Sequence, residues 1–324
     1  MIRLLLMMLV SALMSINPPS AWAGQADTWV KDLQTAQAAL AANKHPLAYK
    51  LYLRHARRNP LAQFVIGQFH QHGWGRAADP VAACAWFGKA ARQRVPTAKH
   101  LWGDCLAQGI GRTQDIPAAL EWYDKAAADG HVLSLCTAGD LHIQGKGVMQ
   151  DVPRGIAMCM RAAQAHSPPA MLQLARHVEL GSPVPQDLVA ARYWYEQAAQ
   201  HRIVEAQYRL GLMLAQGQGG EADLNTALFW LESAASAGHV AAYLPTAMLY
   251  GNAPVQTDTG ALAPAHLAKI YLWTQAALAH QTETAQIDQA RGIAAQVSAV
   301  MPASWRPELD RKVAEHLSRF SASR

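Results

Sequence analysis

Histidine, serine and cysteine are the side chains in this sequence that could carry chemistry, but their spacing matches no familiar active site. His70 and His72 are two residues apart, so on a helix they point to different sides and make a poor pair of metal ligands. No Gly-Lys-Ser/Thr phosphate loop, dinucleotide fingerprint or His-Glu-x-x-His helix occurs. No serine stands in a nucleophile-elbow context. We therefore expect no catalytic residue, no metal site and no cofactor.

Aspartates recur once every 36 residues. This interval places each of them in a separate structural unit, which suits helix N-caps better than the paired carboxylates of an acid/base site. The five are Asp79, Asp115, Asp151, Asp187 and Asp223.

The composition is that of a folded helical protein. The 324 residues are 51% hydrophobic, which is enough apolar material for a core. Alanine-rich stretches predominate over β-branched runs, which favours helices. The formal charge of +5 is spread along the chain except at Arg54, Arg57 and Arg58. A nucleic-acid-binding protein would instead concentrate its cations on one face among stacking aromatics, so nucleic acid is not an expected partner.

The first 23 residues predict a cleavable signal peptide. Arg3 gives a basic start, residues 4–14 form an apolar stretch, and Ala21-Trp22-Ala23 presents small side chains to a signal peptidase. The apolar stretch is too short for a stable membrane-spanning helix, although an uncleaved anchor is the alternative interpretation. Cleavage after Ala23 predicts a periplasmic or secreted protein with no membrane span.

Self-comparison reveals an ungapped repeat of 36 residues. Blocks that begin at Leu61, Thr97, Leu133, Pro169 and Glu205 align glycines, the aspartates, paired alanines and an aromatic residue in shared columns. The thirteenth column contains Gly73, Gly109, Gly145, Gly181 and Gly217. The tryptophan column contains Trp86, Trp122, Trp194 and Trp230, with Met158 as its exception.

Each column has a structural reason, which the second block illustrates. Residues 98–108 predict a first helix, and Gly109 follows its end, where a left-handed backbone suits glycine. Asp115 then caps a second helix, and the small Gly103 lets the two helices approach closely. A single helix pair leaves an apolar face uncovered, so neighbouring pairs must stack. The chain is therefore predicted to be an all-α solenoid of antiparallel helix pairs.

The repeat predicts how the chain is organised. The signal peptide occupies 1–23, a degenerate N-terminal helical unit 24–60, five repeats 61–240, a sixth repeat with a longer loop 241–278, and C-terminal capping helices 279–324. Within the capping segment we expect helix breaks at Met301-Pro302 and at Arg306-Pro307.

This pattern resembles the Sel1-like repeat, a relative of the tetratricopeptide repeat. Ala-x-x-x-x-Gly, Gly-x-Gly, Asp, Ala, Trp-Tyr and Ala-Ala follow in that order, and residues 97–132 match it best. Met158-Cys159 and Pro183 depart from it, which affects local geometry. The resemblance implies a right-handed superhelix. It also implies an adaptor or scaffold, because proteins with such repeats generally have that role and many bacterial ones are exported.

The four cysteines form two candidate pairs. Cys136 and Cys159 are equidistant from the turn within one predicted helix pair, and Cys84 and Cys105 are equidistant from the turn between two pairs. Residues so placed on antiparallel helices can face each other within disulfide distance. Of the three connectivities, this arrangement selects Cys84–Cys105 with Cys136–Cys159. Free cysteines packed as small core residues are the open alternative.

By analogy with tetratricopeptide arrays, the resemblance implies that the first helix of each unit lines a concave partner-binding groove. The first groove column contains Phe64, His100, Cys136, Leu172, Tyr208 and Leu244. The second contains Gln68, Asp104, Asp140, Arg176, Leu212 and Met248. The front half is polar and partly acidic and the rear half is apolar, which predicts an apolar anchor near Tyr208, Leu212 and Met248. Packing of these residues under the C-terminal cap is the alternative.

We expect an exported, non-enzymatic adaptor or scaffold that binds a protein or peptide partner through this groove. One alternative is a weak hydrolase or a binder of cell-wall-related compounds. That function would require a polar constellation in the groove beyond Asp104, Asp140 and His100. Another alternative is a structural element of an envelope assembly.

Overall fold

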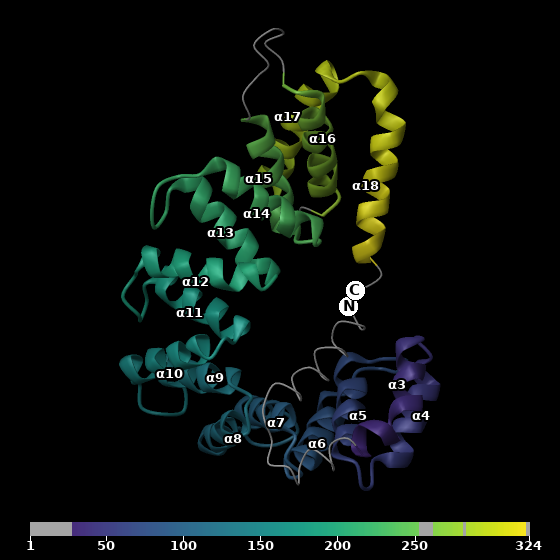
Figure 1. Cartoon of the computed structure of the whole chain (residues 1–324), viewed down its shortest axis with the longest axis vertical. Helices are drawn as coiled ribbons and strands as arrows, with labels where there is room; N and C mark the ends of the chain where they lie inside the picture. The colour runs from purple at the N-terminus through teal and green to yellow at the C-terminus, as the bar shows by residue number, and fades with distance from the viewer. Residues whose placement is uncertain (1–27, 253–261, 281–282, 322–324) are drawn as a thin grey trace. The chain divides into compact units, whose positions relative to one another are not determined.

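The computed structural model describes residues 28–252, 262–280 and 283–321 of the chain. Every regular element in these ranges is helical (Figure 1). The predicted signal peptide and most of the predicted long loop after Gly251 lie outside the described residues. The chain divides into two compact units, one that ends at Ser167 and one that begins at Pro168.

In the first unit, residues 28–32 are helical and precede the longer helices. Those helices are α3 (Gln34–Ala41), α4 (His45–His55), α5 (Pro60–His72), α6 (Pro80–Ala91), α7 (Pro96–Gln108), α8 (Ile116–Ala128), α9 (Leu133–Gln144) and α10 (Val152–Gln164). In the second unit they are α11 (Pro168–Leu180), α12 (Leu188–Gln200), α13 (Val204–Gln216), α14 (Leu224–Ser236), α15 (Val240–Gly251), α16 (Pro264–Leu278), α17 (Thr284–Val300), the short 3₁₀ helix η1 (Ala303–Trp305) and α18 (Arg306–Ser321).

Consecutive helices pack as pairs, and the pairs stack on one another within each unit. In the first unit the pairs are α5 with α6, α7 with α8 and α9 with α10; in the second they are α11 with α12, α13 with α14 and α15 with α16. The buried residues between them form continuous apolar clusters, such as the one that joins α5, α6, α7 and α8. The prediction of an all-α array of stacked helix pairs is confirmed.

The aspartate and glycine columns define the ends of these helices as predicted. Each of the five aspartates is the N-cap of a second helix and accepts a hydrogen bond from the amide three residues later, at 2.9–3.0 Å. Gly109 follows α7 with a φ of 68°, a left-handed conformation that favours glycine. These residues therefore have structural roles.

A second set of glycines lets the two helices of a pair approach. A Cβ on Gly103 of α7 would lie 2.6 Å from a ring carbon of Tyr123 on α8. Gly67 and Phe87 stand in the same relation at 2.4 Å. The aromatic side chain of the second helix therefore occupies the space that a Cβ on the first helix would need.

The third repeat packs its two helices differently, because Cys159 stands where the second repeat has Tyr123. The smaller side chain lets α9 and α10 come closer, so that a Cβ on Gly139 would lie 2.5 Å from the carbonyl oxygen of Gly155. Gly155 itself stands where the second block has Ala119. The contact is backbone against glycine, and it leaves no room for a methyl group on either helix.

We expect Gly139→Ala to lower the free energy of unfolding of the first unit by about 1–3 kcal/mol, because the backbone of α10 must move away to admit the new methyl group. Gly292→Ala is the matched control, since Gly292 lies inside α17 with nothing within 4 Å of its would-be Cβ. That substitution should stabilise its helix by up to about 1 kcal/mol. Urea titration of both variants measures the change in free energy of unfolding, which should be a loss for Gly139→Ala and a gain for Gly292→Ala. A similar loss in both variants would show that the close contact at Gly139 is not the cause.

The C-terminal helices differ from expectation at one proline. The break at Met301-Pro302 is present between α17 and η1, but Arg306-Pro307 does not interrupt a helix. Instead α18 begins at Arg306, so Pro307 lies in its first turn, where the missing N–H has no helical partner to lose. α18 packs on α16, and the Tyr271 hydroxyl donates to Asp310 at 2.6 Å.

Candidate functional site

The first helices of successive repeats lie side by side within each unit. In the first unit, His100 of α7 hydrogen-bonds Ser134 of α9 at 3.0 Å. In the second unit, Arg176 of α11 forms an ion pair with Glu205 of α13 at 2.6 Å. We call the surface formed by the half-buried residues of these first helices the first-helix face of each unit. Two polar clusters lie on it.

The front cluster consists of His100, Asp104, Tyr123, His131 and Ser134. Ser134 Oγ lies 3.0 Å from His100 Nδ1 and 2.9 Å from His131 Nδ1, and the two imidazole rings are 4.5 Å apart. His100 Nε2 lies 3.5 Å from Asp104, which accepts a hydrogen bond from the Tyr123 hydroxyl at 2.7 Å. One proton arrangement serves all of these contacts: His131 Nδ1–H donates to Ser134, whose hydroxyl donates to His100 Nδ1, while His100 Nε2–H faces Asp104.

Burial holds both histidines of this cluster neutral. It lowers the pKa of His100 to about 4, and burial together with the neighbouring His100 lowers the pKa of His131 to about 4. Burial raises the pKa of the Asp104 carboxyl, and the hydrogen bond from Tyr123 opposes that shift. The cluster is thus a network of neutral hydrogen bonds around one partly buried carboxylate, and it ties the second repeat to the third.

The order Asp104, His100, Ser134 has the connectivity of a hydrolytic triad, but its geometry does not allow that reaction. Ser134 has 0% of its surface exposed, so no substrate carbonyl reaches its hydroxyl. The same hydroxyl is also held between two imidazoles and has no free direction of attack. This arrangement joins helices and does not form a nucleophile.

The rear cluster is a network of charges between α11, α12 and α13. Glu179 accepts a hydrogen bond from the Tyr195 hydroxyl at 2.5 Å and lies 3.8 Å from Arg209. Glu205 lies 2.6 Å from Arg176 and 3.9 Å from Arg209. Burial and the hydrogen bond to Glu179 raise the pKa of Tyr195. The rear half of the predicted groove is therefore less apolar than the sequence indicated.

One ring contact of the front cluster recurs in the second unit at equivalent positions of the repeat. The rings of His100 and His131 are in tilted contact with centroids 4.5 Å apart, and those of Tyr208 and His239 are in tilted contact at 4.7 Å. His100 and Tyr208 occupy one column of the repeat, and His131 and His239 occupy another. A ring on the first helix and a histidine in the following turn thus form a repeated contact.

The predicted groove residues divide by exposure. Phe64, Cys136 and Leu244 are 2%, 0% and 5% exposed, so they belong to the core and not to the first-helix face. Met248 is 39% exposed. The remaining predicted residues are half-buried: Gln68, His100, Asp104, Asp140, Leu172, Arg176, Tyr208 and Leu212.

Several residues of these clusters lay outside the predicted columns. They lie on first helices but in other columns of the repeat, so the analogy with two groove columns did not include them: Ser134, Glu179, Glu205 and Arg209. Glu205 and Arg209 are four residues apart, a spacing that indicates an ion pair on a helix surface and could have revealed part of the network.

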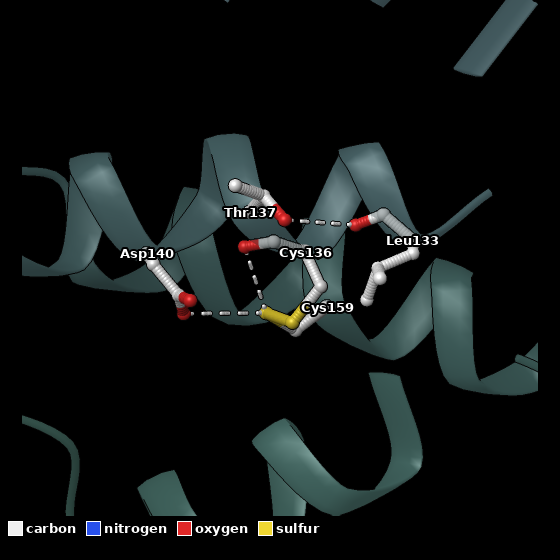
Figure 2. The surroundings of a disulfide bond; sticks show 5 residues. All are labelled: Leu133, Cys136, Thr137, Asp140 and Cys159. Carbon is white, nitrogen blue, oxygen red and sulfur yellow. Dashed lines mark hydrogen bonds between the residues drawn. A yellow bond between two sulfur atoms is a disulfide. The ribbon is translucent and has the colours of Figure 1, made fainter. Parts of the chain in front are cut away.

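Both disulfides form with the predicted connectivity. Cys84–Cys105 joins α6 to α7 with Cα atoms 5.8 Å apart, and Cys136–Cys159 joins α9 to α10 with Cα atoms 3.9 Å apart. Figure 2 shows the second bridge, where the Cys159 sulfur lies 3.9 Å from an oxygen of Asp140. Cys136, Asp140 and Cys159 bring three potential metal donors within 4.8 Å of one another. A metal would need thiolates, which the bridge removes.

Comparisons with known proteins agree with this architecture. A family model described as "Sel1 repeat" matches residues 60–95, 96–131, 135–167, 168–202 and 204–239. Comparison with curated protein sequences gave no significant match. No helix in the described ranges has the length and apolarity needed to cross a membrane.

Two solved structures illustrate the similarity. A Sel1 repeat protein from Oxalobacter formigenes is 28% identical with a TM-score of 0.60, over 76% of this chain and 100% of that one. A protective antigen of uropathogenic Escherichia coli with an SLR fold is 20% identical with a TM-score of 0.60. That match covers 85% of this chain but only 57% of the antigen's length, and it supports the fold alone. Since the matched repeats cover more than half of the chain, the protein belongs to the Sel1 repeat family.

Proposed function

We propose that this protein is an exported, non-enzymatic adaptor that binds a segment of another protein through its first-helix face. The observation that supports the proposal most is the contact between successive first helices, which carry half-buried polar and apolar side chains. A stacked array of this kind offers an extended surface for recognition. Aromatic and apolar residues within such surfaces tend to dominate binding energy.

Export is the second element of the proposal. Both disulfides fit an oxidising compartment, where such bridges persist, and not a reducing cytosol. The expected signal peptide at residues 1–23 would deliver the chain there. Fractionation of cells, with the cysteines alkylated before and after reduction, tests this element. Protein found in the cytosol with four free thiols would contradict it.

Binding through the first-helix face is tested by substituting the predicted anchor. In the second unit, Leu212→Glu with Met248→Glu places two charges on this face, and capture of a partner by crosslinking in the native envelope should be lost. Val189→Glu with Phe229→Glu is the matched control, because these residues are 68% and 62% exposed on second helices. The control should capture the same protein as the wild type.

Circular dichroism must show unchanged helicity in every variant. Because Leu212 is half-buried, Met248→Glu alone serves as a milder second variant. Capture that survives both first-helix variants but not the second-helix control would overturn the assignment of the binding face.

A further inference from the structure

A cavity at the N-terminal end of the first unit concentrates positive charge. It has a volume of about 530 Å³ and lies where α4 ends, close to the helical residues 28–32. Arg54, Arg57 and Arg58 all contribute to its wall. These are the three arginines whose clustering stands out in an otherwise even charge distribution.

Within the part of the chain that the structure describes, the three guanidinium groups have no side-chain partners: none of them forms an ion pair or a side-chain hydrogen bond. A basic residue in the last turn of a helix is favoured by the helix dipole, which accounts for Arg54 in α4. Arg57 and Arg58 lie beyond the end of that helix, so the dipole does not explain why all three line one cavity.

Hydrogen bonds of the buried Asn59 side chain fix part of the cavity wall. Asn59 is 3% exposed and accepts hydrogen bonds from the amides of Leu61 and Ala62 at the start of α5. Its side-chain amide donates to the carbonyl oxygen of Trp29 at 3.0 Å. The backbone of Trp29 is thereby fixed beside Asn59, and Trp29 lines the cavity together with the three arginines.

One acidic residue also lines the cavity. The carboxylate of Asp32 offsets one of the three arginine charges, which leaves a net charge of +2 without His55. Two uncompensated guanidinium groups suit a ligand with more than one negative charge, since each can donate two parallel hydrogen bonds to a carboxylate or a phosphate.

We propose that this cavity is a binding site for a multiply charged oxyanion, a group of phosphates or carboxylates. The site is distinct from the first-helix face, because none of its lining residues belongs to the groove columns. The protein would then have two binding surfaces, the first-helix face for a protein segment and this cavity for an anionic ligand. Bound oxyanions would replace the water that otherwise solvates the unpaired guanidinium groups.

Isothermal titration of the purified protein at low ionic strength tests the proposal, with inorganic pyrophosphate and citrate as separate probes. The triple variant Arg54→Gln, Arg57→Gln, Arg58→Gln should lose at least 100-fold in affinity for the preferred probe. Single variants Arg57→Gln and Arg58→Gln, expected to lose about 10-fold each, are measured in case the triple variant fails to fold. The tighter of the two probes identifies a phosphate or a carboxylate ligand.

Two further variants make the test specific to this cavity. Asp32→Asn removes the opposing charge and should tighten binding several-fold. Arg92→Gln changes the charge by the same amount as each single variant, at an exposed residue outside the cavity, and should bind as the wild type does. Absence of binding by either probe, or equal losses in Arg92→Gln and Arg57→Gln, would overturn the proposal.

Discussion

Replacement of all four cysteines by alanine is expected to lower the free energy of unfolding of the first unit by about 6 kcal/mol. Each bridge closes a loop of similar length, with 21 residues of separation for Cys84–Cys105 and 23 for Cys136–Cys159. The loss of chain entropy in the unfolded state is then about 3 kcal/mol for each bridge. A loss of this size is comparable to the whole stability of many domains.

The second unit supplies an internal control for this prediction, because both bridges lie in the first unit and the chain has no other cysteine. Chemical denaturation followed by hydrogen exchange, resolved by peptide, should show earlier unfolding of the first unit and an unchanged second unit. Reduction of the wild type separates loss of the bridges from loss of the sulfur atoms. A loss below about 1 kcal/mol in the first unit would show that the bridges do not stabilise the folded state as expected.

Acidification from pH 7 to pH 4 is expected to destabilise the first unit through His100 and His131. The pKa of each is about 4 in the folded protein against 6.5 for an ordinary histidine, so between these values the unfolded chain binds protons that the folded chain does not. Stability is therefore full above pH 6.5 and falls as the pH drops toward 4. Each histidine contributes up to about 3 kcal/mol to this loss.

Asp104 works in the opposite direction in the same network. Its raised pKa means that the folded protein takes up a proton at this carboxyl more readily than the unfolded chain, which offsets part of the loss in the acid range. The net loss for the cluster should therefore be smaller than the sum for the two histidines.

Urea titrations at a series of pH values measure this dependence. Substitution of His100 and His131 by asparagine should make the free energy of unfolding depend less on pH between pH 6.5 and 4. Substitution of the exposed His72 by asparagine is the matched control and should leave the profile as it is in the wild type. An unchanged slope in the double variant would show that other groups govern the acid response.

Much of the fold was predictable because its determinants are local and repeat in register. Asp115 is an N-cap and Gly109 a helix C-terminus for reasons contained within a few residues of chain. The cysteine pairing was also predictable, since equal distances from a turn on antiparallel helices bring two residues opposite each other. Free cysteines were the alternative, because the sequence does not show whether the two side chains of a pair point toward each other.

The polar clusters were not predictable in the same way, because they depend on contacts between repeats. Ser134 gives no local signal that it will lie between His100 and His131. The charges of Arg176 and Glu205 are separated by 29 residues, and only the stacking of α11 on α13 makes them a pair. Leu244 was assigned to the groove by column analogy, but its side chain faces the core, because a column fixes a position on a helix and not the depth of its surroundings.

Residue-specific photo-crosslinking in the native cell compartment tests most directly whether the first-helix face is the recognition surface. A photoreactive amino acid is placed at Gln68 or Met248 on first helices, and at Val81 or Val189 on second helices, in otherwise wild-type protein. An adduct with a partner protein is expected from each first-helix position, and none is expected from the second-helix positions. Adducts that arise only from Val81 and Val189 would contradict it.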